Sequence, residues 1–409
     1  MLVPTLWGTP KDRGALSRET TFRRPIIADI VSSFHKYLAA MIENQRIVSS
    51  PSRYIQGPGA LDQLGAVTRD FGKQPLVVTD EILRDLFRDR LSVSFDKAGQ
   101  PFNLVTFPGE VTRPTIDRLT EDARRTGVDL VVGFGGGKAL DTGKGVALFL
   151  GVPFISVPTI AATDAPASFA IAVYDDHHFL SEILMLPRNP EVVLVDSAVI
   201  AGAPLRFLLA GIGDAISKKF EAQACHRAGR ETPNGTRSTR TGLAIANACY
   251  DLIRAHAAPA IAAVKAGQIS ADNTSDDLES LLEATVLLST VGFENAGLSV
   301  SHAIAKGLPM VPRAEGTLHG EHVAYGLLVH LVLEERPVEF ILELVDFYRH
   351  IGLPTTLADF GLTGWTEEEL DTLTANAMLS PSVKRFEVTL DQDMLKAAIR
   401  RVEDLVTGH

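Results

Sequence analysis

The sequence predicts an α/β domain built on a parallel sheet, followed by a domain made only of helices. Short apolar runs alternate with helical patterns from Ile47 to Pro204, and the strand signals stop after Pro204. Residues 206–409 then show long segments of 3.6-residue periodicity, interrupted by Gly and Pro. We therefore expect an N-terminal extension at 1–46, an α/β domain at 47–205 and a helical domain at 206–409.

Five apolar runs of the α/β domain are expected to form the strands of the sheet. They are short, rich in Val and Ile, and read PLVVTD, FNLVTF, DLVVGF, PFISVPT and VVLVD in chain order. Helical patterns such as RPTIDRLTEDARRTG lie between them. Strands that alternate with helices form parallel sheets with both faces covered, and such sheets bind ligands beyond the carboxyl ends of their strands. A site is therefore expected at that edge, in a cleft that faces the helical domain.

Residues 1–46 differ in composition from the rest of the chain. Scattered Arg, Ser and Thr residues precede a short helical pattern, IADIVSSFHKYLAAM. The segment has too many acidic residues for a transit peptide, and its apolar core is too short for a signal peptide. We expect a weakly ordered extension that precedes the first domain.

The overall composition excludes several classes of partner. Hydrophobic residues make up 45% and charged residues 22% of the chain, as in an ordinary globular protein. The net charge of −11 argues against nucleic acid or an anionic membrane as a partner, and the apolar runs are too short to span a membrane. The sequence contains only two cysteines, Cys225 and Cys249, which indicates a reducing, cytoplasmic location.

The stretch VVGFGGGKALDTGKGVA, which begins at Val131, is the most informative part of the chain. The apolar run 130–132 leads into a glycine loop, and a helical segment begins at Lys138 and Ala139. The glycines are Gly133, Gly135, Gly136 and Gly137. A strand, a glycine loop and a helix start together bring backbone N–H groups against a phosphate, which a Cβ atom would obstruct. The stretch favours a nucleotide phosphate. Its spacing is neither G-x-G-x-x-G nor a P-loop, so an ordinary tight turn stays an alternative.

Two further segments are candidates for cofactor or substrate contacts. Asp80 ends the run PLVVTD, where an acid accepts hydrogen bonds from the ribose hydroxyls of NAD and repels the 2′-phosphate of NADP. A helix N-cap is an equally good and compatible role for Asp80. In the segment SVPTIAATDAPAS, Thr159, Thr163 and Ser168 are candidates to line a cofactor, and Asp164 is a candidate to contact a polar substrate. Turn chemistry alone also explains the TDAP sequence.

Three residues of the helical domain form a candidate metal site. Asp214 lies in LLAGIGDAISKKFEA, His302 lies in LSVSHAIAKG, and His319 opens HGEHVAYGLLVHLVLEE. Two imidazoles and a carboxylate suit a divalent metal, and three protein ligands leave positions open for a substrate oxygen. The alternatives are a solvated ion pair of Asp214 with Lys218, four residues later, and histidines that only pack or cap. His322 is a rival ligand that the spacing does not exclude.

Together these segments resemble the glycerol dehydrogenase branch of the metal-dependent alcohol dehydrogenase and dehydroquinate synthase-like superfamily. GGGKALDTGK resembles the phosphate loop of this branch, and PTIAATDAPAS resembles its nicotinamide-side segment. LPRNPEVVLVDSAVIAGAPLRFLLAGIGDA resembles the segment that leads to the metal-binding aspartate, and GFENAGLSVSHAIAKG and HGEHVAYGLLVHLVL resemble the two histidine segments. The resemblance covers about residues 47–405. It implies a dehydroquinate synthase-like fold, with a dinucleotide-binding α/β domain and an all-α metal-binding domain.

The resemblance also implies roles for individual residues, by position. Asp214, His302 and His319 would bind the metal, which is normally zinc in this branch, and His322 has no ligand role. Asp164 would lie near the substrate hydroxyls. The catalytic residues would be Asp164 and the three metal ligands. The NAD contacts would be Asp80, Gly136, Gly137, Lys138, Asp141, Thr159, Ser168 and Tyr174. A homo-oligomer is implied as well, with an octamer as one possible assembly.

Three residues depart from the pattern of the family. Iron-dependent alcohol dehydrogenases carry a further His four residues after the aspartate, and Lys218 stands at that position here, which disfavours iron. Ala139 and Ala162 stand where hydroxyl residues are common, so two hydrogen bonds to the cofactor are expected to be missing. The N-terminal extension has no counterpart in the family.

The activity that the resemblance implies is NAD-dependent oxidation of glycerol and related vicinal diols, with dihydroxyacetone as the product from glycerol. The alcohol oxygen would bind the metal and lose its proton, a hydride would pass to the nicotinamide, and Asp164 would orient the polyol. Two alternatives are a glycerol-1-phosphate dehydrogenase and a dehydroquinate synthase-type cyclase or lyase. Both need a basic pocket, for which the metal segments offer only Lys218, Lys219 and Lys306. A non-catalytic dinucleotide sensor is a third alternative, and it would not need the metal ligands.

Overall fold

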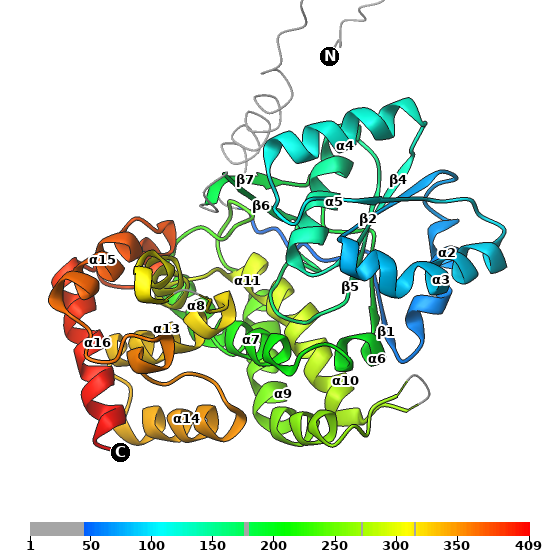
Figure 1. Cartoon of the computed structure of the whole chain (residues 1–409). Coiled ribbons are helices and arrows are strands. Elements are labelled where there is room, and N and C mark those ends of the chain that lie inside the picture. The colour runs from blue at the N-terminus through cyan, green and yellow to red at the C-terminus, as the bar shows by residue number, and fades with distance from the viewer. Residues whose placement is uncertain (1–44, 176–179, 271–272, 315) are drawn as a thin grey trace, which may run out of the picture. The chain divides into compact units, whose positions relative to one another are not determined.

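The computed structural model describes residues 45–175, 180–270, 273–314 and 316–409. The helical pattern IADIVSSFHKYLAAM of the predicted extension lies outside these residues. From residue 45 onward an α/β part is followed by a part made mainly of helices (Figure 1). The last strand of the sheet ends at Asp196, in agreement with the predicted fold class. The division at 205 stays a prediction.

The α/β part contains a six-stranded sheet in which all neighbouring strands are parallel, and a separate antiparallel hairpin. The sheet has the order β1-β8-β5-β4-β2-β3, and the hairpin consists of β6 and β7. The strands are β1 (Arg53–Gly57), β2 (Pro75–Thr79), β3 (Asn103–Thr106), β4 (Leu130–Gly135), β5 (Phe154–Pro158), β6 (Ala170–Tyr174), β7 (Leu180–Met185) and β8 (Val192–Asp196).

The five predicted strands form β2, β3, β4, β5 and β8, which lie side by side in the sheet. Strands β2, β4, β5 and β8 are buried at every residue, which explains their continuous apolar runs. Strand β1 was not predicted, because it is an edge strand whose RYIQG sequence carries a charge and is only partly buried. The hairpin was also missed, because its strands are only partly buried and β7 lacks a continuous apolar run.

Helices cover both faces of the sheet. Along β2, Val77 shares an apolar cluster with Phe95 of α3, whereas its neighbour Val78 shares one with Ile116 of α4. This alternation is what consecutive residues of a strand produce, because their side chains point to opposite faces. The helices of this part are η1 (Ala60–Gln63), α2 (Leu64–Thr68), α3 (Glu81–Ala98), α4 (Arg113–Arg125), α5 (Gly137–Leu150) and α6 (Ser197–Ala201).

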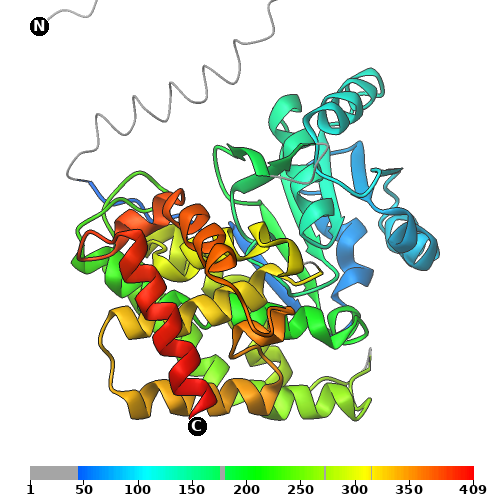
Figure 2. The same ribbon diagram turned by 60° about the vertical axis from the view of Figure 1, so that its left-hand side comes forward.

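The helical part has its own extended apolar core, which also includes Val193 and Val195 of β8. The two parts are therefore packed together along that strand (Figure 2). Within the described residues, no helix is both long enough and apolar enough to cross a membrane. The helices are α7 (Leu205–Ala215), α8 (Lys218–Arg227), α9 (Arg240–Lys265), α10 (Asp276–Leu282), the π-helical η2 (Glu283–Leu288), α11 (Ser289–Ala296), α12 (Val300–Gly307), η3 (Leu308–Met310), η4 (Pro312–Ala314), α13 (His319–Leu333), α14 (Val338–Ile351), η5 (Leu357–Phe360), α15 (Glu367–Met378), η6 (Pro381–Arg385) and α16 (Gln392–Thr407).

The segment LLAGIGDAISKKFEA forms two helices, where its periodicity suggests one. Helix α7 ends at Ala215 and α8 begins at Lys218. The carbonyl oxygen of Asp214 accepts hydrogen bonds from Ser217 Oγ at 2.9 Å and from Lys218 Nζ at 3.0 Å. These side chains replace backbone donors and so account for the break between the two helices.

Glu294 of α11 connects the helical part to the α/β part. One carboxylate oxygen accepts hydrogen bonds from Ser168 Oγ at 2.8 Å and from the Phe169 N–H at 3.0 Å. The other accepts a hydrogen bond from Asn189 Nδ2 at 2.6 Å. Burial raises the pKa of Glu294 to about 7, although these hydrogen bonds favour the charged form.

Replacement of this residue, Glu294→Gln, is expected to change how stability depends on pH. The pKa of the carboxyl is about 7 in the folded protein against 4.5 as its ordinary value, so the folded state binds the proton more tightly. The contribution of the Glu294 carboxyl group to stability is therefore full at low pH and is lost as the pH rises through 7. The difference in free energy of unfolding between the two proteins should change by about 2.5 kcal/mol between about pH 5 and pH 8.

Urea unfolding of both proteins across this range measures the difference. Glu339→Gln on the exposed surface of α14 is the matched control, and it should leave the pH dependence as in the unmodified protein. A difference between Glu294→Gln and the unmodified protein that stays constant with pH would contradict the prediction.

Candidate active site

Asp214, His302 and His319 come from three helices of the helical part and converge at one place, where Asp214 is buried, His302 is partly buried and His319 is exposed. Asp214 lies in the last turn of α7, His302 in the first turn of α12, and His319 is the first residue of α13. One ligand atom from each residue lies within 4.8 Å of the other two. Asp214 Oδ1 and His302 Nε2 are 3.3 Å apart, close to the separation of two ligands held about 2.0–2.1 Å from a tetrahedral zinc ion. The three donors therefore fit a divalent metal, and their assignment as ligands stays a prediction.

Glycine residues bring α7 and α13 close enough for this meeting. A Cβ atom on Gly320 would lie 1.7 Å from the carbonyl oxygen of Ala210, and one on Gly213 would lie 2.4 Å from the carbonyl oxygen of Gly320. Any larger residue would push the two backbones apart. Since Asp214 follows Gly213 and His319 precedes Gly320, the same contact places the two ligands side by side.

A buried carboxylate orients His302. Nδ1 of His302 lies 2.7 Å from Glu221 Oε2, and Glu221 is fully buried. The other oxygen of Glu221 accepts hydrogen bonds from the backbone N–H groups of Ser299 and His302. A carboxylate on one ring nitrogen directs the other nitrogen toward a metal, as second-shell partners do in known sites. The sequence analysis missed Glu221, although an acidic residue next to the apolar stripe, just after Phe220, was a signal of a buried charge.

The two histidines differ in their protonation. Burial lowers the pKa of His302, but the carboxylates of Glu221 and Asp214 outweigh this and raise it to about 9. Desolvation of the His319 ring against the cluster lowers its pKa to about 4, and the neighbouring His302 acts in the same direction, although His319 is exposed at the surface. His319 is thus neutral near pH 7 and offers a free lone pair, whereas His302 must release a proton before it binds a metal.

Lys218 is buried among the same side chains. Its Nζ lies 3.0 Å from Asp164 Oδ2 and 3.2 Å from His302 Nε2, and it also donates to Asp214 Oδ1. Asp214 and Lys218 therefore form the ion pair that their spacing suggests. The expectation that this pair is solvated is wrong, because the two residues are 2% and 0% exposed. Burial opposes both charges, yet the ion pairs prevail, so the pKa of Lys218 lies above its ordinary value and that of Asp214 below it.

Asp164 lies next to this cluster, in the turn that the TDAP sequence predicts. Its carbonyl oxygen accepts a hydrogen bond from the Ser168 N–H at 3.2 Å, so turn chemistry explains the backbone. Its carboxylate accepts a hydrogen bond from Ser289 Oγ at 2.5 Å and pairs with Lys218. Burial and the charge of Asp214 raise the pKa of Asp164. The turn therefore also carries a buried acid to the candidate metal ligands.

His322 lies outside this group of ligand atoms. Its Nε2 is 2.6 Å from Thr317 Oγ1, and its ring lies near Phe360. Burial lowers its pKa to about 3. His322 therefore has a hydrogen-bonded structural place, as the family pattern implies.

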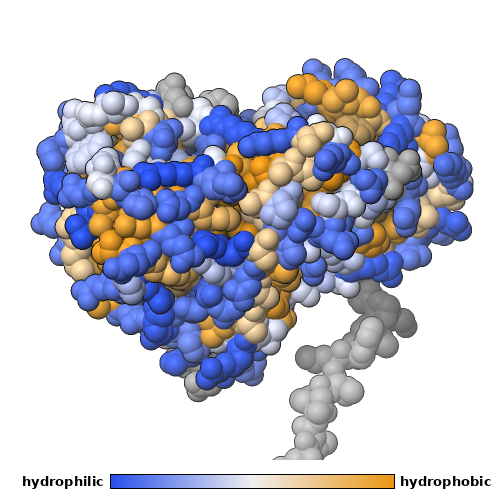
Figure 3. Space-filling model, turned by 90° about the horizontal axis from the view of Figure 1, so that it is seen from below, coloured by the Kyte–Doolittle hydropathy of each residue, from blue (hydrophilic) through white to orange (hydrophobic). Residues whose placement is uncertain are grey.

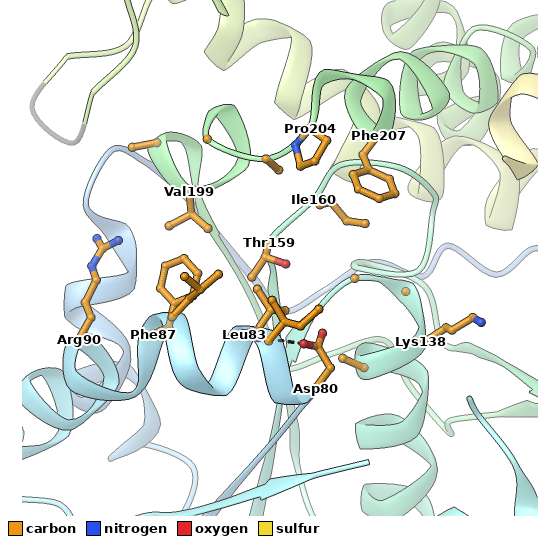
Figure 4. A pocket seen from close by; sticks show the side chains of 18 of the residues that line it. Asp80, Leu83, Phe87, Arg90, Lys138, Thr159, Ile160, Val199, Pro204 and Phe207 are labelled. Atoms are coloured by element: carbon orange, nitrogen blue, oxygen red, sulfur yellow. Dashed lines mark hydrogen bonds between the residues drawn. The ribbon is translucent and has the colours of Figure 1, made fainter. Parts of the chain in front are cut away.

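A cavity of about 940 Å³ lies beyond the carboxyl ends of the sheet strands (Figure 4). Five of the predicted NAD contacts line it, namely Asp80, Gly136, Gly137, Lys138 and Thr159. The sequence analysis missed its apolar walls, which come from α3, the β5–β6 connection and α6–α7: Ile82, Leu83, Leu86, Phe87, Ile160, Val199, Pro204 and Phe207. The size and the apolar walls with few polar groups are typical of a cofactor site.

Asp80 forms the predicted helix N-cap, and its contact with the ribose of NAD stays a prediction. One oxygen accepts a hydrogen bond from the Leu83 N–H at 2.9 Å and caps α3, and the residue also lines the cavity (Figure 4). Gly136 is the N-cap of α5, so the positive end of that helix is exposed to the cavity. Lys138 points away from the apolar walls and pairs with Glu110 at 2.9 Å.

The other three predicted NAD contacts do not line this cavity. Asp141 pairs with Lys144 at 2.9 Å and accepts a hydrogen bond from the Ala172 N–H. Ser168 donates to Glu294, and Tyr174 is partly buried at the end of β6. Their roles in NAD binding stay predictions.

The segment 161–165 connects the cavity to the ligand cluster. A Cβ atom on Gly137 would lie 3.4 Å from Thr163 Oγ1, so the glycine loop contacts this segment. On its other side, a Cβ atom on Gly211 of α7 would lie 1.9 Å from the carbonyl oxygen of Ala161. Asp164 within the segment pairs with Lys218. The segment therefore links the cavity to the cluster that contains Asp214.

These two adjoining sites define the class of protein. A glycine-loop cavity beside a cluster of side chains that could hold a metal ion is what a dinucleotide- and metal-dependent dehydrogenase requires. Its residues 51–197 match the family described as iron-containing alcohol dehydrogenase. Over 317 residues it is 40% identical to the glycerol dehydrogenase of Escherichia coli O6:H1, and the match covers 78% of this chain and 85% of that protein.

Solved structures of similar proteins agree with this match. A probable glycerol dehydrogenase from Sinorhizobium meliloti 1021 superposes with a TM-score of 0.82 at 37% identity, and the match covers 89% of this chain and all of that chain. The glycerol dehydrogenase of Schizosaccharomyces pombe superposes with a TM-score of 0.84 at 30% identity, over 90% of this chain and 93% of that chain. The chain therefore belongs to the iron-containing alcohol dehydrogenase family, together with these glycerol dehydrogenases.

Replacement of one contact glycine, Gly320→Ala, is expected to weaken metal binding. The added methyl group would lie 1.7 Å from the Ala210 carbonyl oxygen, so α13 must move away from α7 and carry His319 away from Asp214. We expect zinc affinity to fall at least about tenfold, and overpacking to cost about 1–3 kcal/mol of stability. Competition with a chromophoric chelator measures the affinity, and urea unfolding measures the stability.

The matched control is Gly202→Ala, where the nearest atoms to the added methyl group are 3.5 Å away. This variant should bind zinc as the unmodified protein does. Unchanged zinc affinity in Gly320→Ala would show that the contact of α7 with α13 does not position the ligands.

Proposed function

We propose that this protein is an NAD-dependent polyol dehydrogenase that oxidises glycerol and related vicinal diols. The observation that carries the proposal is the cluster of Asp214, His302 and His319, which adjoins a glycine-loop cavity through the segment 161–165. The similarity to glycerol dehydrogenases over most of the chain supports glycerol as the substrate. The proposal places hydride transfer where the cavity meets the cluster.

In this proposal the cavity residues hold NAD. The carboxylate of Asp80 accepts hydrogen bonds from the ribose hydroxyls, and the N–H groups at Gly136 and Gly137 hold the diphosphate at the positive end of α5. Leu83 and Phe87 of α3 offer apolar surface to the adenine. When bound, NAD accepts the hydride.

Asp214, His302 and His319 hold the divalent metal, and we propose zinc. Two imidazoles and a carboxylate are donors that suit zinc, and Lys218 stands where iron-dependent members have a further histidine. When bound, the metal supplies a Lewis acid that lowers the pKa of the substrate alcohol. Glu221 keeps His302 oriented and can accept its Nδ1 proton in a hydrogen bond.

Asp164 positions the substrate. Its carboxylate is held by Ser289 and Lys218, next to the metal ligands, and a carboxylate in this place accepts a hydrogen bond from the second hydroxyl of a vicinal diol. A diol fixed in this way presents one carbon to the nicotinamide. The turn at 161–165, packed against α7, keeps water out of the space between substrate and cofactor.

The proposal extends to the assembly and location of the protein. On the face seen in Figure 3, apolar side chains gather in patches between hydrophilic ones, which supports contact with further copies of the chain in a homo-oligomer. The two buried cysteines, Cys225 and Cys249, are free thiols and support a cytoplasmic location.

The proposal is tested by NAD reduction, followed by absorbance, with glycerol, 1,2-propanediol and glycerol 1-phosphate. Metal-stripped and zinc-restored protein are compared in each case. We expect turnover of glycerol and the diol that zinc restores, and none of the phosphate ester. His302→Ala should lose about 10³-fold or more in kcat/KM because one metal ligand is removed. Turnover of the phosphate ester alone would move the protein to a glycerol-1-phosphate dehydrogenase, and a His302→Ala variant with full activity would overturn the metal site.

Cofactor preference is tested separately with Asp80→Ser. Serine keeps an N-cap for α3, so the stability of the helix should change little. The loss of the negative charge should lower the preference for NAD over NADP, given as the ratio of the two kcat/KM values, by at least about tenfold. Asp85→Ser on the same helix, where the acid is exposed, is the control. An unchanged ratio in Asp80→Ser would show that Asp80 acts only as a helix cap.

A further inference from the structure

A single lysine lies among three acids in the proposed metal site, two of them buried and one, Asp164, partly buried. Asp164, Asp214 and Glu221 carry the carboxylates, and Lys218 is the one lysine or arginine that pairs with Asp164 or Asp214 among the described residues. The Lys218 side chain is 0% exposed, and its Nζ also lies 5.7 Å from the centre of the Phe293 ring. Buried carboxylates without a compensating cation are strongly destabilising. Lys218 therefore supplies positive charge on which this cluster depends.

The ammonium group uses the same atoms that a metal would use. Nζ donates to Asp214 Oδ1 and lies 3.2 Å from His302 Nε2, and these two atoms are proposed metal ligands. Zinc bound to both at about 2.0–2.1 Å would take the place of the ammonium group at these two atoms, and His302 would release its proton. Two cations a few ångströms apart in a buried site also repel each other strongly. The lysine and the metal cannot both keep these contacts unchanged.

We infer that Lys218 is an internal competitor of the divalent metal. In the metal-free protein its ammonium group holds Asp214 and His302 in place. A metal that binds takes over these two ligands, and Lys218 retains its ion pair with Asp164, 3.0 Å away. This inference rests on the metal site of the proposed function and adds a residue that sets its affinity.

Two consequences follow for the protein. Metal binding is weaker than the three ligands alone would give, because part of the binding free energy displaces the ammonium group. The metal-free protein keeps an assembled site, so loss of the metal is reversible and does not unfold the helical part. The enzyme therefore exchanges its metal, and the fraction of protein that carries metal follows the free metal concentration.

The test measures zinc affinity of the full chain by competition with a chromophoric chelator, without any turnover assay. Lys218→Met and Lys218→Gln remove the charge, and Gln retains a hydrogen-bond donor. We expect both to bind zinc at least about tenfold more tightly than the unmodified protein. Lys219→Met is the matched control: this neighbouring lysine faces Asp251 and Tyr250, away from the site, and its removal should leave zinc affinity unchanged.

Melting temperature is the second measurement. Zinc should raise the melting temperature of Lys218→Met and Lys218→Gln more than that of the unmodified protein, because the variants lack the ammonium group that pairs with Asp164 and Asp214 in the metal-free state. A variant that does not fold without metal is purified with zinc, and its affinity is then measured by removal with the chelator.

Equal or weaker zinc binding in both Lys218 variants would overturn the inference, because Lys218 would then be neutral toward the metal or would support it. A failure of the proposed function is distinguishable: the protein would then bind zinc as expected but would not reduce NAD with glycerol or the diol.

Discussion

The close contact between the backbones of α7 and α13 is the constraint on which the site depends. Gly213 and Gly320 allow carbonyl oxygens of one helix to approach Cα atoms of the other more closely than any side chain permits. Asp214 and His319 are the direct neighbours of these glycines in the chain. The geometry of these two candidate ligands is therefore set by rigid helices and not by loops, which gives the precision that a metal site requires.

This contact also sets the electrostatics of the site. It buries Asp214 in a helical core where water cannot solvate its charge, so the surrounding residues must compensate it. Lys218 follows one turn later and reaches back to the carboxylate, and Glu221 follows Lys218 and holds His302. The break between α7 and α8 belongs to the same arrangement, because Ser217 and Lys218 both donate to the carbonyl oxygen of Asp214. Packing, helix termination and charge pairing at this point depend on one another.

Much of the fold could be predicted from the sequence, because a parallel sheet buries both faces of its central strands. Continuous apolar runs such as PLVVTD and VVLVD follow from this burial, and they form β2 and β8. Strand β1 and the hairpin lie at an edge or outside the sheet, where partial burial permits mixed sequences and removes the signal. The N-cap role of Asp80 and the turn at Asp164 were predictable because both rest on local chemistry.

The site was less predictable, because periodicity assumes that charged residues face water. Asp214 and Lys218 have the spacing of a solvated ion pair, and the same spacing serves equally well when both residues are buried. The residues next to a charged residue in the sequence distinguish a buried ion pair from a solvated one. Glycines precede Asp214 in GIGDA and follow His319 in HGE, and a glycine inside a helix is unfavourable unless another backbone approaches it. A charged residue next to such a glycine is thus more probable at a buried helix contact than on a solvated face. The three candidate ligands could be named by resemblance. The place of Lys218 among them could not, because it depends on contacts of Lys218 with His302 and Asp164, which are far from it in the chain and which no local pattern encodes.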